Sequence, residues 1–372
     1  MSPIPEQIPE PGAVPNGDVV GSRANRWKIV WRILFLLVSV ITLYGLLPQL
    51  LSVFGEIPKL RELNPVWFIA TVVLECGSFV CQWRLTRTAL PQVSWFVAGT
   101  AQLASNAVSK TVPGGAAVGA ATGYRMLSVS GVNRGNAGAG LAATSIISNG
   151  VLLALPMVAI LGSILSAPVP SNLAVVAWGG ALLFLALFAI VFVLVRFDRP
   201  LHAVGRVVER VGGWVNAKLH RTGGPKAADL IHQRDVMIDA LGSRWEVALA
   251  AAVGNWGLDY LALVACLYAV GATPRLSLIL VAYAVAAVAS MIPITPGGLG
   301  FVEAGLVTAL IAAGVNGDAA VLATLAYRLV SYWLPIPAGL VATILFRRRY
   351  GRVDNQPEEA APGAAPGAPA GV

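Results

Sequence analysis

The sequence predicts an all-α polytopic membrane protein with six full spans and two re-entrant helical hairpins in an inverted repeat. Composition is the first observation: the 372 residues are 56% hydrophobic and only 12% charged, with a mean hydropathy of +0.73, which leaves too little polar surface for a soluble globule. The second is a Pro-Gly-Gly sequence that breaks one apolar segment at Pro113 and another at Pro296. The third is the tripeptide Gly-Val-Asn, which follows each break at the same offset, from Gly131 and from Gly314. Matching interrupted segments in the two halves of a chain predict an internal repeat.

The two ends of the chain are predicted to be disordered and cytoplasmic. Residues 1–26 begin with a proline-rich stretch without apolar periodicity, and residues 350–372 consist mainly of alanine, proline and glycine. The transmembrane domain is expected between them, over 27–349. Lysine and arginine collect in cytoplasmic loops, and four arginines follow the last apolar segment between residues 347 and 352. We therefore expect a multi-pass protein of the cell membrane with both termini in the cytoplasm.

The full spans alternate with loops, and the charges of each loop indicate on which side of the membrane it lies. Predicted spans cover residues 33–53, 65–83, 137–165, 173–195, 245–270 and 319–346. The loop 196–244 holds nine Lys or Arg residues against five Asp or Glu residues, which places it in the cytoplasm. Its apolar residues between 201 and 215 fall at helical spacing, so an amphipathic helix on the membrane surface is expected there.

The hairpins are predicted over residues 94–130 and 276–313. Proline removes a backbone N–H and glycine is costly in a helix, so each Pro-Gly-Gly ends a helix inside its apolar segment. The arms after Gly115 and Gly298 are short for a crossing of about 30 Å at 1.5 Å per residue. Charges of the flanking loops indicate that the first hairpin enters from the cytoplasm and the second from outside. These charges fit eight or more full spans equally well, so that alternative stays open.

The breaks supply groups that bind anions. A helix that restarts after Pro-Gly-Gly presents N–H groups without intrahelical partners, and its dipole is positive there. The glycines would let a phosphate approach the backbone, and Lys110 lies just before the first break. The predicted phosphate site comprises Pro113, Gly114 and Gly115 with Lys110, and Pro296, Gly297 and Gly298. A valine at Gly298 is expected to block the phosphate and leave the protein folded.

Charged residues inside the spans need partners. Arg328 lies about 15 Å deep in the last span, and Glu303, an acid inside the preceding apolar segment, is expected to pair with it. Glu75 pairs more loosely with Lys110, whereas Asp259 has no obvious partner. Three further polar residues are expected to line a cavity or to satisfy backbone groups: Asn106, Tyr124 and Tyr327. Two roles stay open for each charged pair, namely fixing the helices and binding substrate.

No catalytic or metal-binding constellation accompanies these residues. The three histidines all fall in the loop 196–244 without metal spacing, and sequences typical of hydrolases, zinc peptidases or nucleotide-binding loops are absent. The three cysteines lie in apolar segments and are expected to be reduced. The net charge of +8 is explained by basic residues in the predicted cytoplasmic loops, so no nucleic-acid partner is expected. We expect no cofactor and no enzyme activity.

The sequence resembles the flippase-like transmembrane domain of the lysylphosphatidylglycerol synthase family. The residues that carry the resemblance are Pro293 to Gly300 with Glu303, Tyr327-Arg328, Tyr332 to Pro335, Trp83-Arg84, Asn106, and Pro113 to Arg125. The resemblance implies movement of a lipid between leaflets, with its headgroup in a cavity between the repeats. The soluble synthase domain has no counterpart in this sequence, so lipid synthesis is not expected.

The first reading is therefore a flippase or transporter for an anionic phospholipid or glycolipid. One alternative is a membrane scaffold that holds a lipid-modifying or glycan-modifying transferase through the loop 196–244. Another is a membrane enzyme with Glu303 or Asp259 as general base. A partner transferase and a homo-oligomer are both left open by the sequence.

Overall fold

A computed structural model of the protein describes residues 63–112, 115–166, 242–290 and 298–351, with isolated positions between 179 and 210. Contacts divide the chain into the units Met1–Pro48 and Gln49–Val372, and the described residues all belong to the second. The predicted segments 1–26 and 33–53 lie outside the described residues, as does the tail beyond 351. The predicted span 173–195 and loop 196–244 are described only at scattered positions. Among these, Arg206, Val207 and Arg210 are helical.

Every regular element in the described residues is a helix. In chain order they are α3 (Pro65–Ala89), α4 (Trp95–Thr111), α5 (Gly115–Val129), α6 (Arg134–Ser166), η1 (Gly242–Arg244), α10 (Trp245–Ala269), α11 (Leu276–Ala289), α12 (Phe301–Ala312), α13 (Gly317–Arg328), η3 (Leu329–Trp333) and α14 (Pro335–Tyr350). Four stretches of this part are long and apolar enough to cross a membrane: Pro65–Ala89, Arg134–Ala159, Trp245–Ala269 and Gly317–Tyr350. The all-α membrane class is thereby confirmed.

The last of these stretches contains a distortion that the sequence analysis did not anticipate. Between α13 and α14 the chain makes one π-helical turn, η3, in which Leu334 N–H donates to the Leu329 carbonyl five residues earlier. Pro335 follows at once, and proline has no N–H to donate to the carbonyl of Ser331. The wide turn therefore leaves a backbone carbonyl available to another helix.

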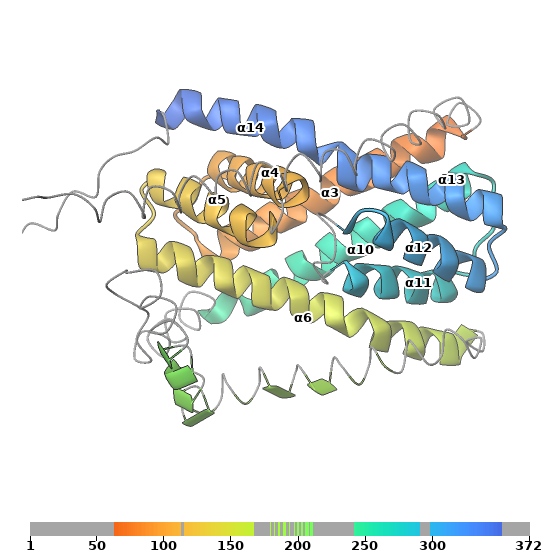
Figure 1. Ribbon diagram of the computed structural model, residues 1–372, viewed down its shortest axis with the longest axis horizontal. Coiled ribbons are helices and arrows are strands. Elements are labelled where there is room, and N and C mark those ends of the chain that lie inside the picture. Colours follow the sequence, from red (N-terminus) through yellow and green to blue (C-terminus); the bar gives the residue numbers. More distant parts are fainter. Residues whose placement is uncertain are drawn as a thin grey trace, which may run out of the picture. The chain divides into compact units, whose positions relative to one another are not determined.

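Two pairs of short helices stand where the hairpins are predicted. The arms α4 and α5 have 17 and 15 residues, and α11 and α12 have 14 and 12, whereas a span needs about 20. Figure 1 shows α4 and α5 at one end of the long helices and α11 and α12 at the other. The break in the second pair is confirmed, because α11 ends at Ala289 and α12 begins at Phe301.

The repeated Gly-Val-Asn tripeptide has the same local structure in both halves. Gly131 and Gly314 have φ values of 95° and 91°, a left-handed conformation that glycine adopts readily. The next valine N–H reaches back five residues, to Leu127 in one half and Leu310 in the other. The asparagine side chain then accepts an N–H two residues ahead, at the start of α6 or α13. The tripeptide thus ends one helix and begins the next.

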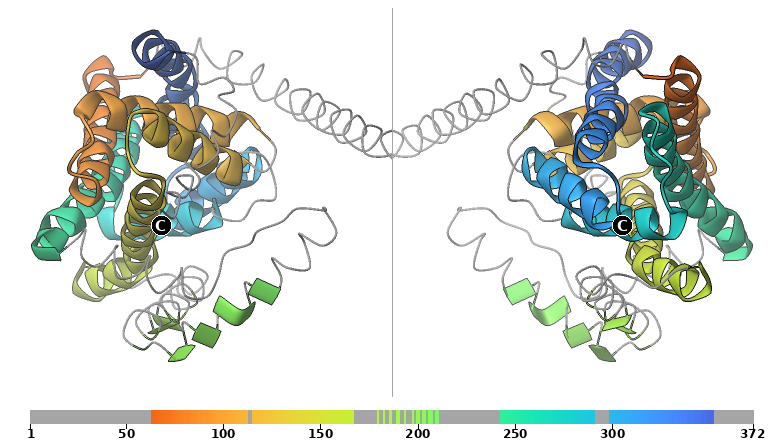
Figure 2. Two further views of the ribbon diagram at one scale, coloured as in Figure 1. Left: turned by 90° about the vertical axis from the view of Figure 1, so that its left-hand side faces the viewer. Right: turned by 90° about the vertical axis from the view of Figure 1, so that its right-hand side faces the viewer.

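The helices α3 and α10 form a long antiparallel pair. Asn64 N–H, just before α3, donates to the carbonyl of Ala269 at the end of α10, at 2.9 Å. Further along, Ser78 Oγ donates to Asn255 Oδ1 at 3.2 Å, so residue numbers rise on one helix as they fall on the other. Both end-on views in Figure 2 show the two helices side by side.

The remaining helices pack in a reciprocal pattern. The helix α14 of the second half packs on α4 of the first, and α6 of the first half packs on α11 of the second. The largest apolar cluster joins α10, α11, α12 and α13, and a second cluster joins α4, α5 and the last turn of α14 at Phe346. Each hairpin is therefore held by the long helix of the other half.

The arms of the first hairpin are held close by small residues. A Cβ added to Gly119 would collide with Ser109 Oγ, and one added to Gly123 would lie 2.6 Å from Ser105 Oγ. Glycines spaced four residues apart on one helix let a neighbouring backbone approach in this way. The sequence carries this signal at Gly115, Gly119 and Gly123.

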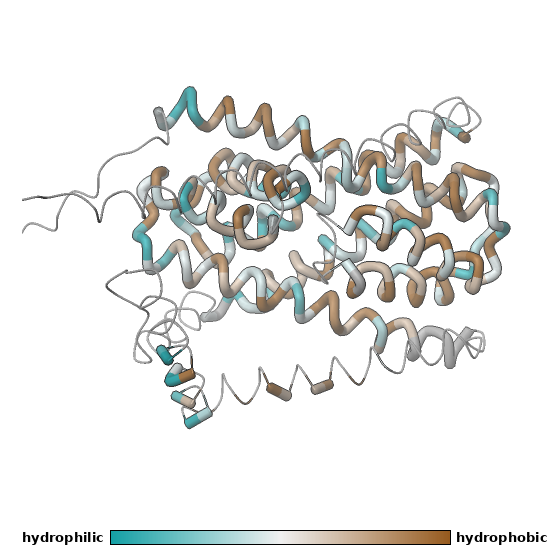
Figure 3. The backbone as a smooth tube through the Cα atoms, viewed as in Figure 1, coloured by the Kyte–Doolittle hydropathy of each residue, from teal (hydrophilic) through white to brown (hydrophobic). Residues whose placement is uncertain are grey.

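Polar and apolar residues are distributed as a membrane requires. Figure 3 shows hydrophilic segments gathered at the end of α14 and at the turn from α5 to α6, where Arg347 to Arg349 and Arg134 lie. Because α3 and α10 are antiparallel, Arg87 near the end of α3 lies toward the start of α10, where Arg244 precedes it. Large apolar side chains are exposed along the outer faces, among them Ile69 and Leu340.

Candidate functional site

A polar cavity of about 360 Å³ lies between the two halves. Residues from α3, α4, α6, α10, α11, α12, α13 and η3 line it, including Lys110 near the end of α4 and Ser290 at the end of α11. The C-terminal ends of α4 and α11 therefore reach the cavity. Six of the predicted site residues line it, namely Glu75, Asn106, Lys110, Asp259, Tyr327 and Arg328.

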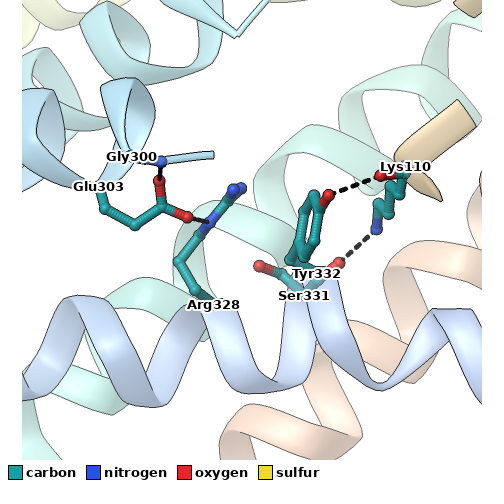
Figure 4. A network of polar contacts seen from close by, with 6 residues as sticks. All are labelled: Lys110, Gly300, Glu303, Arg328, Ser331 and Tyr332. Carbon is teal, nitrogen blue, oxygen red and sulfur yellow. Dashed lines mark hydrogen bonds and ion pairs between the residues drawn. The ribbon is translucent and has the colours of Figure 1, made fainter. Parts of the chain in front are cut away.

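The predicted pair of Glu303 and Arg328 is confirmed. Arg328 Nε donates to Glu303 Oε1 at 2.6 Å. The arginine side chain is 11% exposed and the glutamate side chain is 21% exposed. The other oxygen, Glu303 Oε2, accepts the backbone N–H of Gly300 at 2.7 Å, as Figure 4 shows. The guanidinium also lies over the ring of Tyr332, 4.4 Å from its centroid. One carboxylate thus caps α12 and holds α13.

Lys110 binds the π-helical turn and not Glu75. Its Nζ donates to the Ser331 carbonyl at 2.7 Å. This is the carbonyl to which Pro335, having no N–H, cannot donate. The Tyr332 hydroxyl in turn donates to the Lys110 carbonyl at 2.8 Å. Within the described residues, Lys110 and Glu75 form no ion pair within 4 Å, although both line the cavity and Lys110 faces Glu75. The looser pairing that the sequence predicts is therefore not a direct contact. The sequence did contain a signal for the observed contact, because a proline inside a span always frees the carbonyl four residues earlier.

Asp259 has two partners that the sequence analysis did not identify. The Tyr283 hydroxyl donates to Asp259 Oδ2 at 2.6 Å, and the Tyr327 hydroxyl donates to Oδ1 at 2.8 Å. Both tyrosines are buried, at 2% and 8% exposure. The carboxyl group of α10 therefore joins α11 to α13. Tyr283 gave no signal in the sequence beyond being the one hydroxyl-bearing residue between Leu278 and Ala289.

Some predicted site residues lie elsewhere. Tyr124 packs in the apolar cluster of α4 and α5 and is not among the cavity-lining residues. Gly115 begins α5 against the Ser109 backbone. Pro113, Gly114, Pro296 and Gly297 lie outside the described residues.

Gly298 lies within the described residues, and its geometry alters the effect that we expect from a valine substitution at this position. Its φ is +72°, and an added Cβ would lie 2.6 Å from Val302 Cγ2, so a β-branched side chain strains the backbone. The expectation that this variant stays folded is therefore corrected. The helix also restarts at Phe301 and not directly after Gly298, and the carboxylate of Glu303 already occupies the N–H of Gly300.

We predict that Tyr283→Phe and Tyr327→Phe each lower the free energy of unfolding by about 1–3 kcal/mol, because each removes one hydroxyl donor from the half-buried carboxyl group of Asp259. Guanidinium or SDS unfolding of the purified protein, followed by tryptophan fluorescence, measures this change. Tyr124→Phe is the matched control, and we expect it to alter stability by under about 0.5 kcal/mol. Equal effects of all three substitutions would show that the Asp259 bonds contribute nothing specific.

Comparisons with known proteins identify the family of the chain. A family model described as "Lysylphosphatidylglycerol synthase TM region" matches residues 24–339. The chain belongs to this family. A UPF0104 membrane protein of Methanothermobacter thermautotrophicus is 35% identical over 97 residues, which cover 26% of this chain and 28% of that relative. The chain therefore matches little more than a quarter of the curated relative's length.

Membership in the lysylphosphatidylglycerol synthase transmembrane-region family makes this an integral membrane protein of a lipid-related family. The match contains both hairpins and every charged residue that lines the cavity, since all of these fall between residues 24 and 339. The matched description concerns the transmembrane region alone, and it names no catalytic domain within these residues.

Proposed function

We propose that this protein moves an anionic phospholipid or glycolipid between the leaflets of the cell membrane. The observation that carries the proposal is the polar cavity between the two halves, into which Lys110 and Arg328 bring positive charge at the depth of the hairpin tips. Its volume of about 360 Å³ suits a lipid headgroup. The acyl chains would remain among the exposed apolar faces outside it.

The Glu303 carboxylate indicates how a lipid phosphate would be held. It binds the N–H of Gly300 before α12 and the guanidinium of Arg328, which are the two kinds of donor that a phosphate prefers. An entering phosphate would compete with Glu303 for these donors. Competition makes the coupling reciprocal, so lipid weakens the Glu303–Arg328 pair as much as the pair weakens lipid binding.

The topology that we propose has the hairpins entering from opposite faces, as halves of an inverted repeat. The antiparallel pair of α3 and α10, the reciprocal packing of α4 on α14 and of α6 on α11, and the placement of the hairpins at opposite ends support it. The arginine-bearing helix ends lie together, which favours a cytoplasmic C-terminus. Both hairpin tips then meet near the bilayer midplane, where transporters of this type bind substrate.

The test is transbilayer movement of fluorescent phosphatidylglycerol in vesicles that contain the purified protein. We expect the protein to expose inner-leaflet probe to an impermeant quencher faster than protein-free vesicles do. A glycolipid probe and a neutral lipid probe, assayed in parallel, define the headgroup class. If no anionic lipid moves in a protein-dependent way, the transport proposal fails and a scaffold for a partner transferase becomes the better explanation.

A further inference from the structure

The carboxyl groups of Glu75 and Asp259 meet where α3 crosses the cavity against α10. Glu75 is only 6% exposed, and its carboxyl group faces that of Asp259. Both residues line the cavity. Two carboxylates that face each other in such a cavity, one buried and one half-buried, repel each other, since the local dielectric is lower than that of water.

One oxygen of this pair has no partner. Asp259 uses both oxygens, accepting from Tyr327 at Oδ1 and from Tyr283 at Oδ2. Glu75 Oε2, in contrast, is buried without any hydrogen bond partner among the described residues. A buried acceptor left unsatisfied is costly, so a donor that can occupy this position would be bound there.

The groups that face Glu75 come from every helix around it. Asp259 faces it from α10, Lys110 from α4, Tyr283 from α11 and Tyr327 from α13. The positive charge of Arg328, on α13, repels that of Lys110, and Arg328 is itself paired with Glu303 of α12. Lys110 Nζ donates to the Ser331 carbonyl. Among the described residues, three carboxyl groups thus stand against two cations in and beside the cavity, and neither cation bonds to Glu75.

We propose that Glu75 and Asp259 form a proton-binding site that couples lipid movement to proton entry. The inference rests on the proposed function and adds its energy source. A proton from the aqueous phase, delivered by hydronium, forms an O–H bond at Glu75 Oε2. The neutral acid no longer repels the Asp259 carboxylate, and its new O–H can donate to that carboxylate. The bond breaks when water on the other side accepts the proton.

Binding of this proton also changes the charge that a lipid meets. With the proton bound, three carboxyl groups contribute two negative charges, which the two cations balance, so an anionic headgroup enters a neutral cavity. Proton and lipid then favour each other's binding, and the coupling free energy is the same in both directions. We therefore expect anionic lipid to move preferentially from the more acidic side.

The chemistry of the site favours a proton over a metal cation. Sodium or calcium takes several oxygen ligands, but the carboxyl pair offers one unpartnered oxygen, because both Asp259 oxygens are used by tyrosines. Among the described residues, no group of three histidine, cysteine or acidic side chains is placed to hold a metal.

The decisive variant is Glu75→Gln in the full-length protein. In vesicles with an imposed pH gradient, we expect wild-type movement of fluorescent phosphatidylglycerol to follow the gradient and the variant to lose that response. Glu246→Gln, an exposed carboxyl in the first turn of α10, is the matched control and should respond as the wild type does. A wild-type response retained by Glu75→Gln, or a response to a sodium gradient in place of pH, would overturn the proposal.

A second readout does not depend on transport. Infrared difference spectra of the purified protein, recorded between acidic and alkaline pH, should contain the C=O band of a buried protonated carboxyl that disappears in Glu75→Gln and persists in Glu246→Gln. Lipid movement without this band and without a pH-gradient response overturns the proton site and leaves lipid transport standing. The band without movement of any lipid overturns transport and leaves the proton site standing.

Discussion

Arg328→Gln is expected to lower the free energy of unfolding by about 3–5 kcal/mol, because it strands the largely shielded carboxylate of Glu303. The present pair is short, with 2.6 Å between Nε and Oε1, and it is mostly shielded from solvent. The substitution also removes the guanidinium from the face of Tyr332. SDS or guanidinium unfolding of the purified protein in detergent measures the loss.

Two variants of Glu303 separate the contribution of its charge to stability from the contribution of the hydrogen bond that it accepts from Gly300. Glu303→Gln keeps an oxygen that accepts the Gly300 N–H but removes the charge, whereas Glu303→Ala removes both. We expect the alanine variant to be less stable than the glutamine variant by about 1 kcal/mol, the usual value of a helix cap. Exchanging the two charged residues should not restore stability, because an arginine at 303 cannot accept that N–H and would lie at the positive end of α12.

Asp318→Asn is the control for these variants. It lies in the first turn of α13, on the same helix as Arg328, but is exposed, so its removal should cost under about 1 kcal/mol. Arg328→Gln and Glu303→Gln proteins as stable as Asp318→Asn would show that the pair does not hold the hairpin.

The sequence was sufficient to place elements and one ion pair. Hydropathy and helix breakers act locally, so the long helices, the break before Phe301 and the boundaries at Gly-Val-Asn follow from short stretches of sequence. Glu303 and Arg328 could be matched because an arginine deep in a span requires an anion and Glu303 is an acid inside the preceding apolar segment.

The contacts of Asp259 and Lys110 could not be predicted in the same way. They depend on how each helix is rotated about its axis and on which helix lies beside it, and hydropathy fixes neither when a helix is apolar all round. Lys110 and Ser331 are 221 positions apart in the chain. Only the pairing of α4 with the π-helical turn brings them together, and that pairing depends on the packing of both halves.

Lys110→Met is expected to abolish most of the anionic lipid transport that we propose, and to destabilise the fold less than Arg328→Gln does. Lys110 and Arg328 are the cations that line the cavity within the described part of the chain, and Lys110 Nζ is bonded to the neutral carbonyl of Ser331. A phosphate can therefore take this cation without displacing a carboxylate. Loss of a charge-assisted hydrogen bond of about 1.5–3 kcal/mol corresponds to a rate reduced roughly tenfold to a hundredfold.

Lys110→Gln separates the charge from the structural bond. Methionine leaves the Ser331 carbonyl without a donor, since Pro335 has none, and should cost about 1–3 kcal/mol of stability. Glutamine retains an N–H donor near this carbonyl, so it should recover part of that stability but none of the transport. Arg244→Gln, an exposed basic residue before α10, should leave both quantities unchanged.

The assay is the movement of fluorescent phosphatidylglycerol in vesicles, with unfolding measured on the same preparations. A glutamine variant that transports as the wild type does, while methionine fails in both stability and transport, would reduce Lys110 to a support for the π-helical turn. A glutamine variant that is stable and inactive would instead identify the charge of Lys110 as the group that receives the headgroup, because the turn is then intact and only the cation is missing.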